Sequence, residues 1–500
     1  MIRRLPRIVL VGTVVVTTLY GALLIPDTAP TISFAAPDQE RHPFVWNQDA
    51  FWSTLEESYV QARAAGCQSV TPAISNAVGQ MHLRIARLAR ERFSPGDMIF
   101  TEIEQLVFQL GPWIGACPSD LPSYMDLVSR VRGAVKRQSE RWNMEGRTAR
   151  ETMYRLLYGG RTAVEEVILQ MPPDSQPGTT TPGTNKPSVT PSSTLLDVTI
   201  RSGDILVSRG GAPTSALIAR GNDFPGNFSH VALVYIDAVT RQPQLIESRI
   251  ERGVTVSSLD DYMRDTKLRI MVLRLRADLP ALRADPLLPH RAAEAALRRS
   301  LAHHIPYDFA LDPRATTAMY CSKVVSDAYA RFGIHLWMGL SHVTSRTLRE
   351  WLAGFGVRHF DAQEPSDLEY DPQLSVVAEW RDTETLRKDH QDNAVTEAML
   401  DAAERGLHLQ YQWYLLPLAR LAKAYSAVLN RFGALGPVPE GMSATAALRS
   451  RWYSSLHGQV LRRVEAQAAA FLSQRGYPPP YWRLVRMASD ALRELGATKA

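Results

Sequence analysis

Apolar residues in the first third of the chain recur at the spacing of amphipathic helices. The clearest stripe consists of residues three or four positions apart (Ile74, Val78, Met81, Ile85 and Leu88). Similar spacing in segments 99–110, 121–138 and 149–169 predicts further helices. We therefore expect a helical domain over residues 40–170, a bundle of about five helices whose stripes form its core rather than a ligand site.

The pattern changes after this bundle. Residues 171–195 consist mainly of Pro, Thr, Ser and Gly, a composition that offers little to bury and predicts a linker. After it come short apolar runs typical of strands (Asp204–Val207, Val231–Ile236, Leu245–Glu247 and Ile270–Leu275). Farther along the chain, Leu374–Trp380 is predicted to form another strand, which could close the same sheet.

These strands, with helices expected near 290–304 and Ser322–Arg331, predict an α+β domain with an antiparallel sheet over residues 196–383. From residue 390 to 500 the pattern is helical again. Two helical regions are thus expected to flank the α+β domain. The aromatic residues of the second region are expected to pack in its core.

The first 26 residues differ from the rest, because Arg3, Arg4 and Arg7 precede an uncharged stretch from Ile8 to Ile25. Such a segment predicts export, and its 18 residues just reach the length of a membrane-spanning helix. It is either a cleaved signal peptide or a retained anchor in the inner membrane. Both alternatives place the remainder in the periplasm or on the outer face of the cytoplasmic membrane.

Composition and motifs exclude several function classes. A net charge of +5 on 500 residues is small and spread along helices, so we expect no nucleic-acid partner. Neither Cys-x-x-Cys nor His-Glu-x-x-His spacing occurs, and Gly210-Gly211 lacks the lysine of a phosphate-binding loop. We expect neither a metal nor a cofactor.

The chain has three cysteines, at positions 67, 117 and 321. In an oxidising compartment, Cys67 and Cys117 are the economical disulfide pair, because both fall in the first helical region. Closing that loop would add about 4 kcal/mol to the free energy of unfolding in the chain-entropy model. Cys321 is then left as an odd thiol.

Cys321 heads a predicted helix that continues through Ser322-Lys323-Val324-Val325. Unpaired N–H groups and the helix dipole at such a position lower the pKa of a thiol and raise its thiolate fraction. Cys321 is thus a candidate nucleophile, although a buried cysteine is more often an inert apolar residue.

His230 stands where a loop enters a predicted strand, and Glu247 lies in the next strand. With a turn centred near residue 238 or 239, the two side chains fall opposite or nearly opposite each other. Glu247 could then orient the imidazole and support its charged form, which is the nucleophile, base and orienter arrangement of covalent hydrolases. The alternative is a polar cross-strand pair without a catalytic task.

Five short motifs in this order resemble a known group (Ser202-Gly203-Asp204-Ile205-Leu206, Phe228-Ser229-His230-Val231-Ala232, Leu245-Ile246-Glu247-Ser248, Pro306-Tyr307-Asp308 and Tyr320-Cys321-Ser322). That group is the circularly permuted branch of the NlpC-type papain-like cysteine peptidases, the YiiX/YebB-like amidases. In the permuted branch the histidine and acid precede the cysteine, as they do here. The resemblance covers residues 196–383 only.

The resemblance implies Cys321 as nucleophile, His230 as base and Glu247 as the third polar residue. Tyr320 and the Cys321 N–H are candidates for oxyanion stabilisation. Tyr307 and Asp308 fit either a loop lining the cleft or a turn, and Asp204 is expected to cap or brace the opening strand. The implied activity is hydrolysis of amide or isopeptide bonds, with cell-wall peptides as the expected substrate. Alternatives are a lipid-directed acyltransferase or esterase of the same fold, and a catalytically silent envelope scaffold.

Overall fold

A computed structural model describes residues 17–18, 20–27, 44, 54–171, 177–183 and 186–496. Most of the segment predicted as a signal or anchor, residues 1–26, lies outside this part of the chain. None of the helices in the described residues has both the length and the apolar character needed to cross a bilayer.

The first helical region follows the predicted periodicity. It contains α3 (Leu55–Ala65), α4 (Cys67–Arg90), α5 (Met98–Ala116), α6 (Leu121–Ser139), α7 (Arg147–Met153) and α8 (Gly159–Gln170), with a π-helical segment (Tyr154–Tyr158) between the last two. Four residues of the expected stripe on α4 are buried in its core, and Val78 packs against them. Cys67 and Cys117, at the start of α4 and just after α5, form the predicted disulfide.

One seven-stranded antiparallel sheet organises the middle of the chain, in the order β1-β11-β8-β4-β5-β6-β7. Its strands are β1 (Thr180–Pro182), β4 (Ile205–Gly210), β5 (His230–Ile236), β6 (Pro243–Arg249), β7 (Gly253–Ser258), β8 (Lys267–Leu275) and β11 (Leu374–Trp380). The α+β fold class is therefore confirmed. The late strand β11 does not close the sheet; it lies between β8 and the edge strand β1.

The segment predicted as a linker, residues 171–195, contributes short strands. Its residues 180–182 form β1 against β11, and residues 192–195 form β2 (Ser192–Leu195) against β3 (Val198–Arg201). Strand pairing uses backbone N–H and C=O groups, so a segment with few apolar side chains can still complete a sheet edge. The composition of the segment therefore does not show that its residues 180–182 pair with β11.

Helices cover the sheet and connect its strands. The connecting helices are α9 (Pro213–Arg220), α10 (Leu259–Arg264), α11 (Pro280–Ala284), α12 (Leu288–Ala302), α13 (Cys321–Ala330), α14 (Arg346–Phe355) and α15 (Asp367–Tyr370), with a small ladder of β9 (Ser341–His342) and β10 (Asp361–Ala362). Apolar residues of α12 and α13 share one core with alternate residues of β4, β5 and β8. The other alternate residues of these strands form a second core with Ile200 of β3 and Tyr262 of α10.

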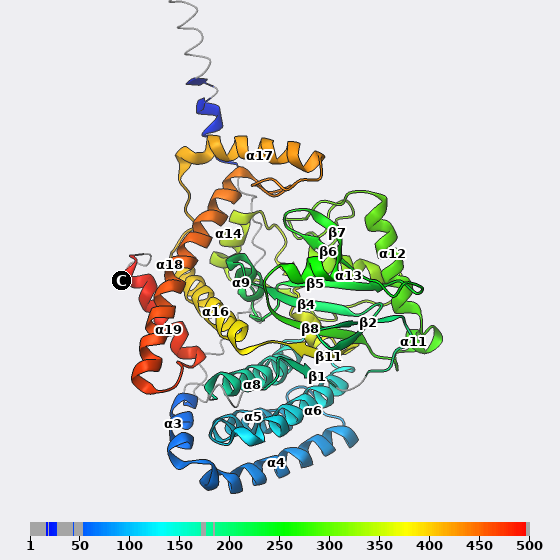
Figure 1. Cartoon of the computed structure of the whole chain (residues 1–500), viewed down its shortest axis with the longest axis vertical. Helices are drawn as coiled ribbons and strands as arrows, with labels where there is room; N and C mark the ends of the chain where they lie inside the picture. The colour runs from blue at the N-terminus through cyan, green and yellow to red at the C-terminus, as the bar shows by residue number, and fades with distance from the viewer. Residues whose placement is uncertain are drawn as a thin grey trace, which may run out of the picture.

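The C-terminal helices are α16 (Thr383–Glu404), α17 (Leu416–Arg431), α18 (Ala444–Arg475) and α19 (Tyr481–Glu494). Figure 1 shows α16, α18 and α19 standing beside the sheet, the first helical region below it, and α17 at the top of the view. Helix α16 begins seven residues before the predicted boundary at 390, because Asp382 and Thr385 form a capping box there.

Buried ion pairs join the three regions. Glu165 of α8 pairs with Arg269 of β8 at 2.6 Å, and Arg269 also pairs with Asp389 of α16 at 2.5 Å. Arg161 of α8 pairs with Glu369 of α15 at 2.6 Å. These charges are almost fully buried. Loss of one partner would therefore leave the charge of the other less compensated in the interior, which is strongly destabilising.

Candidate active site

His230 and Glu247 meet on one face of the hairpin formed by β5 and β6. In the observed register Glu247 lies opposite Ala232, so His230 is its diagonal neighbour two residues along. Diagonal side chains remain within reach on a pleated surface, and His230 Nε2 lies 2.6 Å from Glu247 Oε2. The turn is centred about one residue later than expected, since Asp237 and Gln242 close it.

Glu247 is fixed in its ionised form by its surroundings. Its side chain is fully buried, and its Oε1 accepts a hydrogen bond from Ser257 Oγ at 2.7 Å and lies 3.1 Å from Arg249 Nε. Burial acts to raise the pKa of this carboxyl, but the hydrogen bond and charge of His230, with Arg249 and Ser257, lower it to about 2. Glu247 is thus a carboxylate throughout the neutral range.

Cys321 is the first residue of α13, as predicted. Two contacts hold the preceding segment: Ser248 Oγ of β6 donates to the Met319 carbonyl at 2.6 Å, and Met319 N donates to the Pro306 carbonyl at 3.0 Å. Cys321 is buried, with 7% of the residue exposed. It therefore has a fixed position at a helix N-terminus, where backbone N–H groups favour a negative charge.

The thiol of Cys321 interacts with His230 and with a backbone group. Burial acts to raise its pKa, but hydrogen bonding to His230, the imidazolium charge and the Val231 N–H lower it below its ordinary value. His230 Nε2 is occupied by Glu247, which leaves Nδ1 for the thiol. Burial likewise acts to lower the pKa of His230, yet Cys321 and Glu247 raise it to about 9.

These opposite shifts favour one charge state of the pair at neutral pH. A thiol with a lowered pKa beside an imidazole with a raised pKa forms a thiolate and an imidazolium. The thiolate is the reactive nucleophile, and the imidazolium holds a proton ready for a leaving group. The arrangement can therefore perform acyl chemistry.

Cys321 lies between two spaces of different character. On one side is a polar cleft of about 610 Å³ that contains His230 and Glu247 and is lined by charged side chains, among them Arg249, Glu251, Arg252 and Lys267. On the other is a pocket of about 140 Å³ with mainly apolar walls (Leu217, Ile218, Phe309, Leu311, Leu352 and Phe355). Tyr307 borders both.

The remaining predicted residues take different places. Tyr320 lines the apolar pocket, and its hydroxyl lies 3.4 Å from Gln363 Oε1. Asp308 accepts hydrogen bonds from the backbone N–H groups of Ala310 and Asp312 at 2.9 and 2.7 Å. These bonds fit the turn-forming role left open for Asp308, and it is not among the residues lining either space.

Asp204 has the bracing position that was expected. Its carboxylate is buried, accepts from the Arg201 N–H at 2.7 Å and pairs with Arg274 at 2.7 Å. These bonds fix the start of β4 against β8, away from the thiol.

Several neighbours of the site were missed by sequence reasoning. The Val231 N–H contacts the thiol, and Ser257 and Arg249 hold Glu247. Glu364, which lines the apolar pocket, has a pKa raised well above its usual value by burial, and by the charges of Asp367 and Cys321. No motif or spacing in the sequence marks these residues as part of a catalytic site. They come together there only through the fold.

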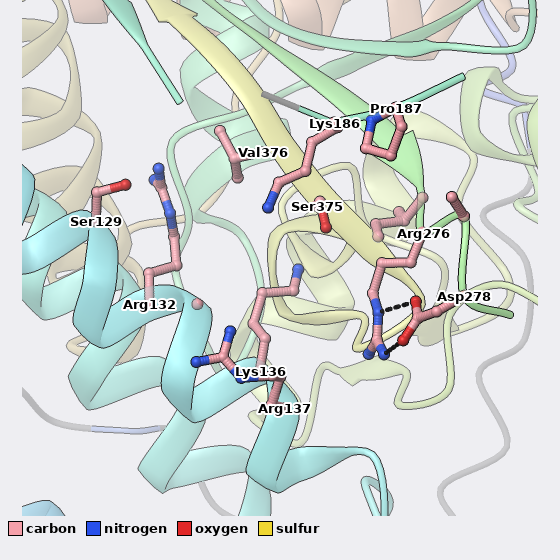
Figure 2. A pocket seen from close by; sticks show the side chains of 13 residues that line it. Ser129, Arg132, Lys136, Arg137, Lys186, Pro187, Arg276, Asp278, Ser375 and Val376 are labelled. Atoms are coloured by element: carbon pink, nitrogen blue, oxygen red, sulfur yellow. Dashed lines mark hydrogen bonds and ion pairs between the residues drawn. The ribbon is translucent and has the colours of Figure 1, made fainter. Parts of the chain in front are cut away.

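A third space, of about 310 Å³, lies between α6 and the sheet and is lined by none of the residues His230, Glu247 and Cys321. Figure 2 shows Lys136, Lys186 and Arg276 around it, with Arg276 held by Asp278. Burial and the neighbouring arginines lower the pKa of Lys136 to about 7, despite nearby Asp371 and Glu369. Among the described residues no group of three or more His, Cys, Asp or Glu side chains could hold a metal.

Comparison with known proteins agrees with this geometry. Residues 199–378 match the model of a family described as permuted papain-like amidase enzymes, YaeF/YiiX, the C92 family. A comparison with curated proteins finds no match to the chain. The matched segment includes His230, Glu247 and Cys321. Residues 199–378 thus form a domain of the permuted papain-like amidase family, and the chain is a cysteine hydrolase of the peptidase and amidase class.

Proposed function

We propose that this chain cleaves amide bonds outside the cytoplasm through Cys321, His230 and Glu247, with cell-wall peptides as substrate. The observation that carries the proposal is the buried pairing of Cys321 with His230, supported from behind by Glu247. Export is supported by the basic residues that precede the uncharged stretch from Ile8 to Ile25.

In the first half of the reaction, the Cys321 thiolate attacks the carbonyl carbon and forms a C–S bond. The negative charge of the tetrahedral intermediate develops near the N-terminus of α13, where the Cys321 N–H is the first candidate donor. His230 then gives its proton to the amine, the C–N bond breaks, and an acyl thioester remains on Cys321.

In the second half, neutral His230 takes a proton from water, and the hydroxide oxygen attacks the thioester. The C–S bond breaks, the carboxylic product leaves, and the proton on His230 restores the imidazolium beside the thiolate. Glu247 stays ionised throughout and stabilises each imidazolium, because its pKa lies near 2.

A peptide substrate fits the polar cleft. Its walls present both cations and anions, with Arg249, Arg252 and Lys267 near Glu251 and Asp265. Cell-wall peptides carry carboxylates and amines that such a surface can pair with. The charged cleft would then hold the polar part of the peptide, and the apolar pocket would hold a side chain next to the scissile bond.

A lipid-directed acyl hydrolase or transferase is a second candidate, and the pocket on the other side of Cys321 favours it. Its apolar side chains, including Phe309, Leu352 and Phe355, could receive part of an acyl chain. The nucleophile and base would be the same, and only the acyl donor would differ.

Incubation of the full chain with muropeptides and, separately, with phospholipids, read by mass spectrometry, tests the two candidates. We expect loss of an amide-linked group from muropeptides and no product from Cys321→Ala. Cleavage of phospholipid alone would replace the first proposal with the second. If neither is cleaved and a thiol-directed probe labels wild type and His230→Ala equally slowly, the site is silent and the scaffold alternative holds.

A further inference from the structure

The segment around α17 gathers an unusual amount of exposed apolar surface. Eight large side chains between residues 413 and 435 are 47–81% exposed (Trp413, Tyr414, Leu418, Leu421, Tyr425, Val428, Phe432 and Leu435). From Tyr414 on, they recur every three or four residues, and those on α17 therefore share one face of the helix. We call these eight residues the α17 stripe.

The opposite face of α17 already has its partners. Leu416 and Ala419 are buried against Ala444 of α18, and Ser426 Oγ accepts a hydrogen bond from Val438 N at 2.9 Å. Helix α17 is thus held to the molecule by one side, and the stripe faces away from that contact. Figure 1 shows the helix lying across the top of the molecule.

The charge pattern of this segment distinguishes between possible partners. Residues 412–436 contain Arg420, Lys423 and Arg431 and no Asp or Glu. An anionic lipid surface would attract this segment, whereas a cationic partner would repel it. Trp and Tyr next to aliphatic residues and cations are typical of helices that lie in the membrane interface.

The N-terminal apolar stretch ends beside the same helix. Arg420 Nη1 donates to the Ala22 carbonyl at 2.9 Å and lies close to Asp27, whose carboxylate accepts from Thr445 N and Oγ1 at 3.1 Å. Tyr20 and Ile25 are themselves exposed at this end. Residues 20–27, at the end of the uncharged stretch, therefore meet the body of the protein at α17.

We propose that the α17 stripe lies in the interface of an anionic lipid bilayer, as a second membrane contact beside the N-terminal segment. This contact would also orient the active site. Leu435 of the stripe lines the cleft that contains His230 and Cys321, and Met442, a few residues later, lines the apolar pocket. The cleft would thus open close to the membrane surface.

The test uses the full chain with Cys321→Ser, in which Cys67 and Cys117 are joined, so that an introduced cysteine is the single reactive thiol. Leu421→Cys on α17 or, as a matched control, Leu83→Cys on α4 carries an environment-sensitive fluorophore; both leucines are more than half exposed. Each protein is bound to vesicles of phosphatidylcholine with or without phosphatidylglycerol. Because the N-terminal segment is present in both, the label reports only its own site.

We expect the label at 421 to emit at shorter wavelength on vesicles with phosphatidylglycerol, to lose quenching by aqueous iodide, and to be quenched by nitroxide lipids. The label at 83 should show none of these changes. Iodide quenching at 421 that stays as strong as at 83 on vesicle-bound protein would overturn the proposal. Protection of position 421 that needs no lipid and grows with protein concentration would assign the stripe to a second copy and overturn it as well.

A second variant tests whether the stripe residues themselves contact lipid, or whether any loss of exposed apolar side chains changes the signal of the label. Leu418→Gln with Val428→Gln should raise the fraction of the label at position 421 that iodide can reach. The equilibrium constant for burying this segment in the interface should fall about tenfold for each apolar side chain replaced. The control pair Leu301→Gln with Leu472→Gln removes two exposed leucines from α12 and α18. Equal effects of the two pairs would count against the stripe as the contact.

Discussion

At the residue scale, the reactivity of Cys321 depends on contacts made by one histidine. A cysteine buried to this extent has a raised pKa unless a positive charge or a donor compensates. His230 supplies both, and Glu247 keeps His230 charged. The same three residues therefore determine both the ionisation of the thiol and its orientation.

Replacing His230 by alanine should convert the thiolate into an unreactive thiol at neutral pH. Without the imidazolium, burial dominates and the pKa of Cys321 rises above its ordinary value. The rate of alkylation by iodoacetamide, measured against pH, should then fall strongly below pH 8 relative to wild type. His304→Ala removes an exposed histidine paired with Glu440 at 2.7 Å and serves as the control; an equal effect there would contradict the role of His230.

Substituting Glu247 by glutamine should shift the pH profile of kcat/KM. In the wild type, we expect activity to fall as the pH rises through about 9, because the pKa of His230 is raised to that value. The amide removes the negative charge that raises the pKa of His230, so this alkaline limb should move to lower pH. The maximal kcat/KM should fall roughly 10²- to 10⁴-fold, while Glu440→Gln leaves the profile in place. An unshifted alkaline limb in Glu247→Gln would show that another group sets it.

At the element scale, the site is assembled from the hairpin of β5 and β6 and the start of α13. The hairpin register brings His230 beside Glu247, and contacts of Met319 with Ser248 and Pro306 position the segment before Cys321. The helices of the first region contribute no residue to either space around the thiol. A substitution that destabilises these helices is therefore expected to leave the reactivity of Cys321 unchanged, and the two properties can be measured separately.

The disulfide should stabilise the first helical region without affecting the site. Its loop spans 50 residues, so Cys67→Ser with Cys117→Ser should lower the free energy of unfolding by about 4 kcal/mol in the chain-entropy model. Urea unfolding followed by circular dichroism measures this loss. Alkylation of Cys321 under native conditions should be unchanged. A large change in that rate would mean that the helical region supports the site directly.

At the scale of the whole molecule, buried charges tie the sheet to α8 and to α16. Glu165 of α8 contacts Arg269 and lies 3.7 Å from Arg161 and 3.6 Å from Arg381. Without Glu165, these buried arginines would keep only Asp389, Glu369 and Glu379 as partners. Removing one negative charge from such a buried network costs more than losing an exposed pair. The helical regions and the sheet therefore depend on one another for stability.

Glu165→Ala should accordingly lower the free energy of unfolding by about 3–5 kcal/mol. The exposed pair of Glu102 with Arg84 provides the control, and Glu102→Ala should cost at most about 1 kcal/mol. Thermal unfolding followed by circular dichroism compares the two variants. A similar small loss in both would show that the buried network contributes little to holding the regions together.

The sequence by itself determined the features that repeat locally or follow in a fixed order. Helical stripes, the β5–β6 hairpin, the helix starting at Cys321, the pairing of Cys67 with Cys117 and the order of the family motifs were all visible, because each depends on neighbouring residues or on spacing. The tertiary structure alone decided the rest. It paired the Thr-rich segment with β11 through backbone groups, gave Asp308 the turn-forming one of its two possible roles, and brought Val231, Ser257 and Glu364 to the site. Such contacts join residues far apart in the chain or use backbone atoms, and neither leaves a periodic trace in the sequence.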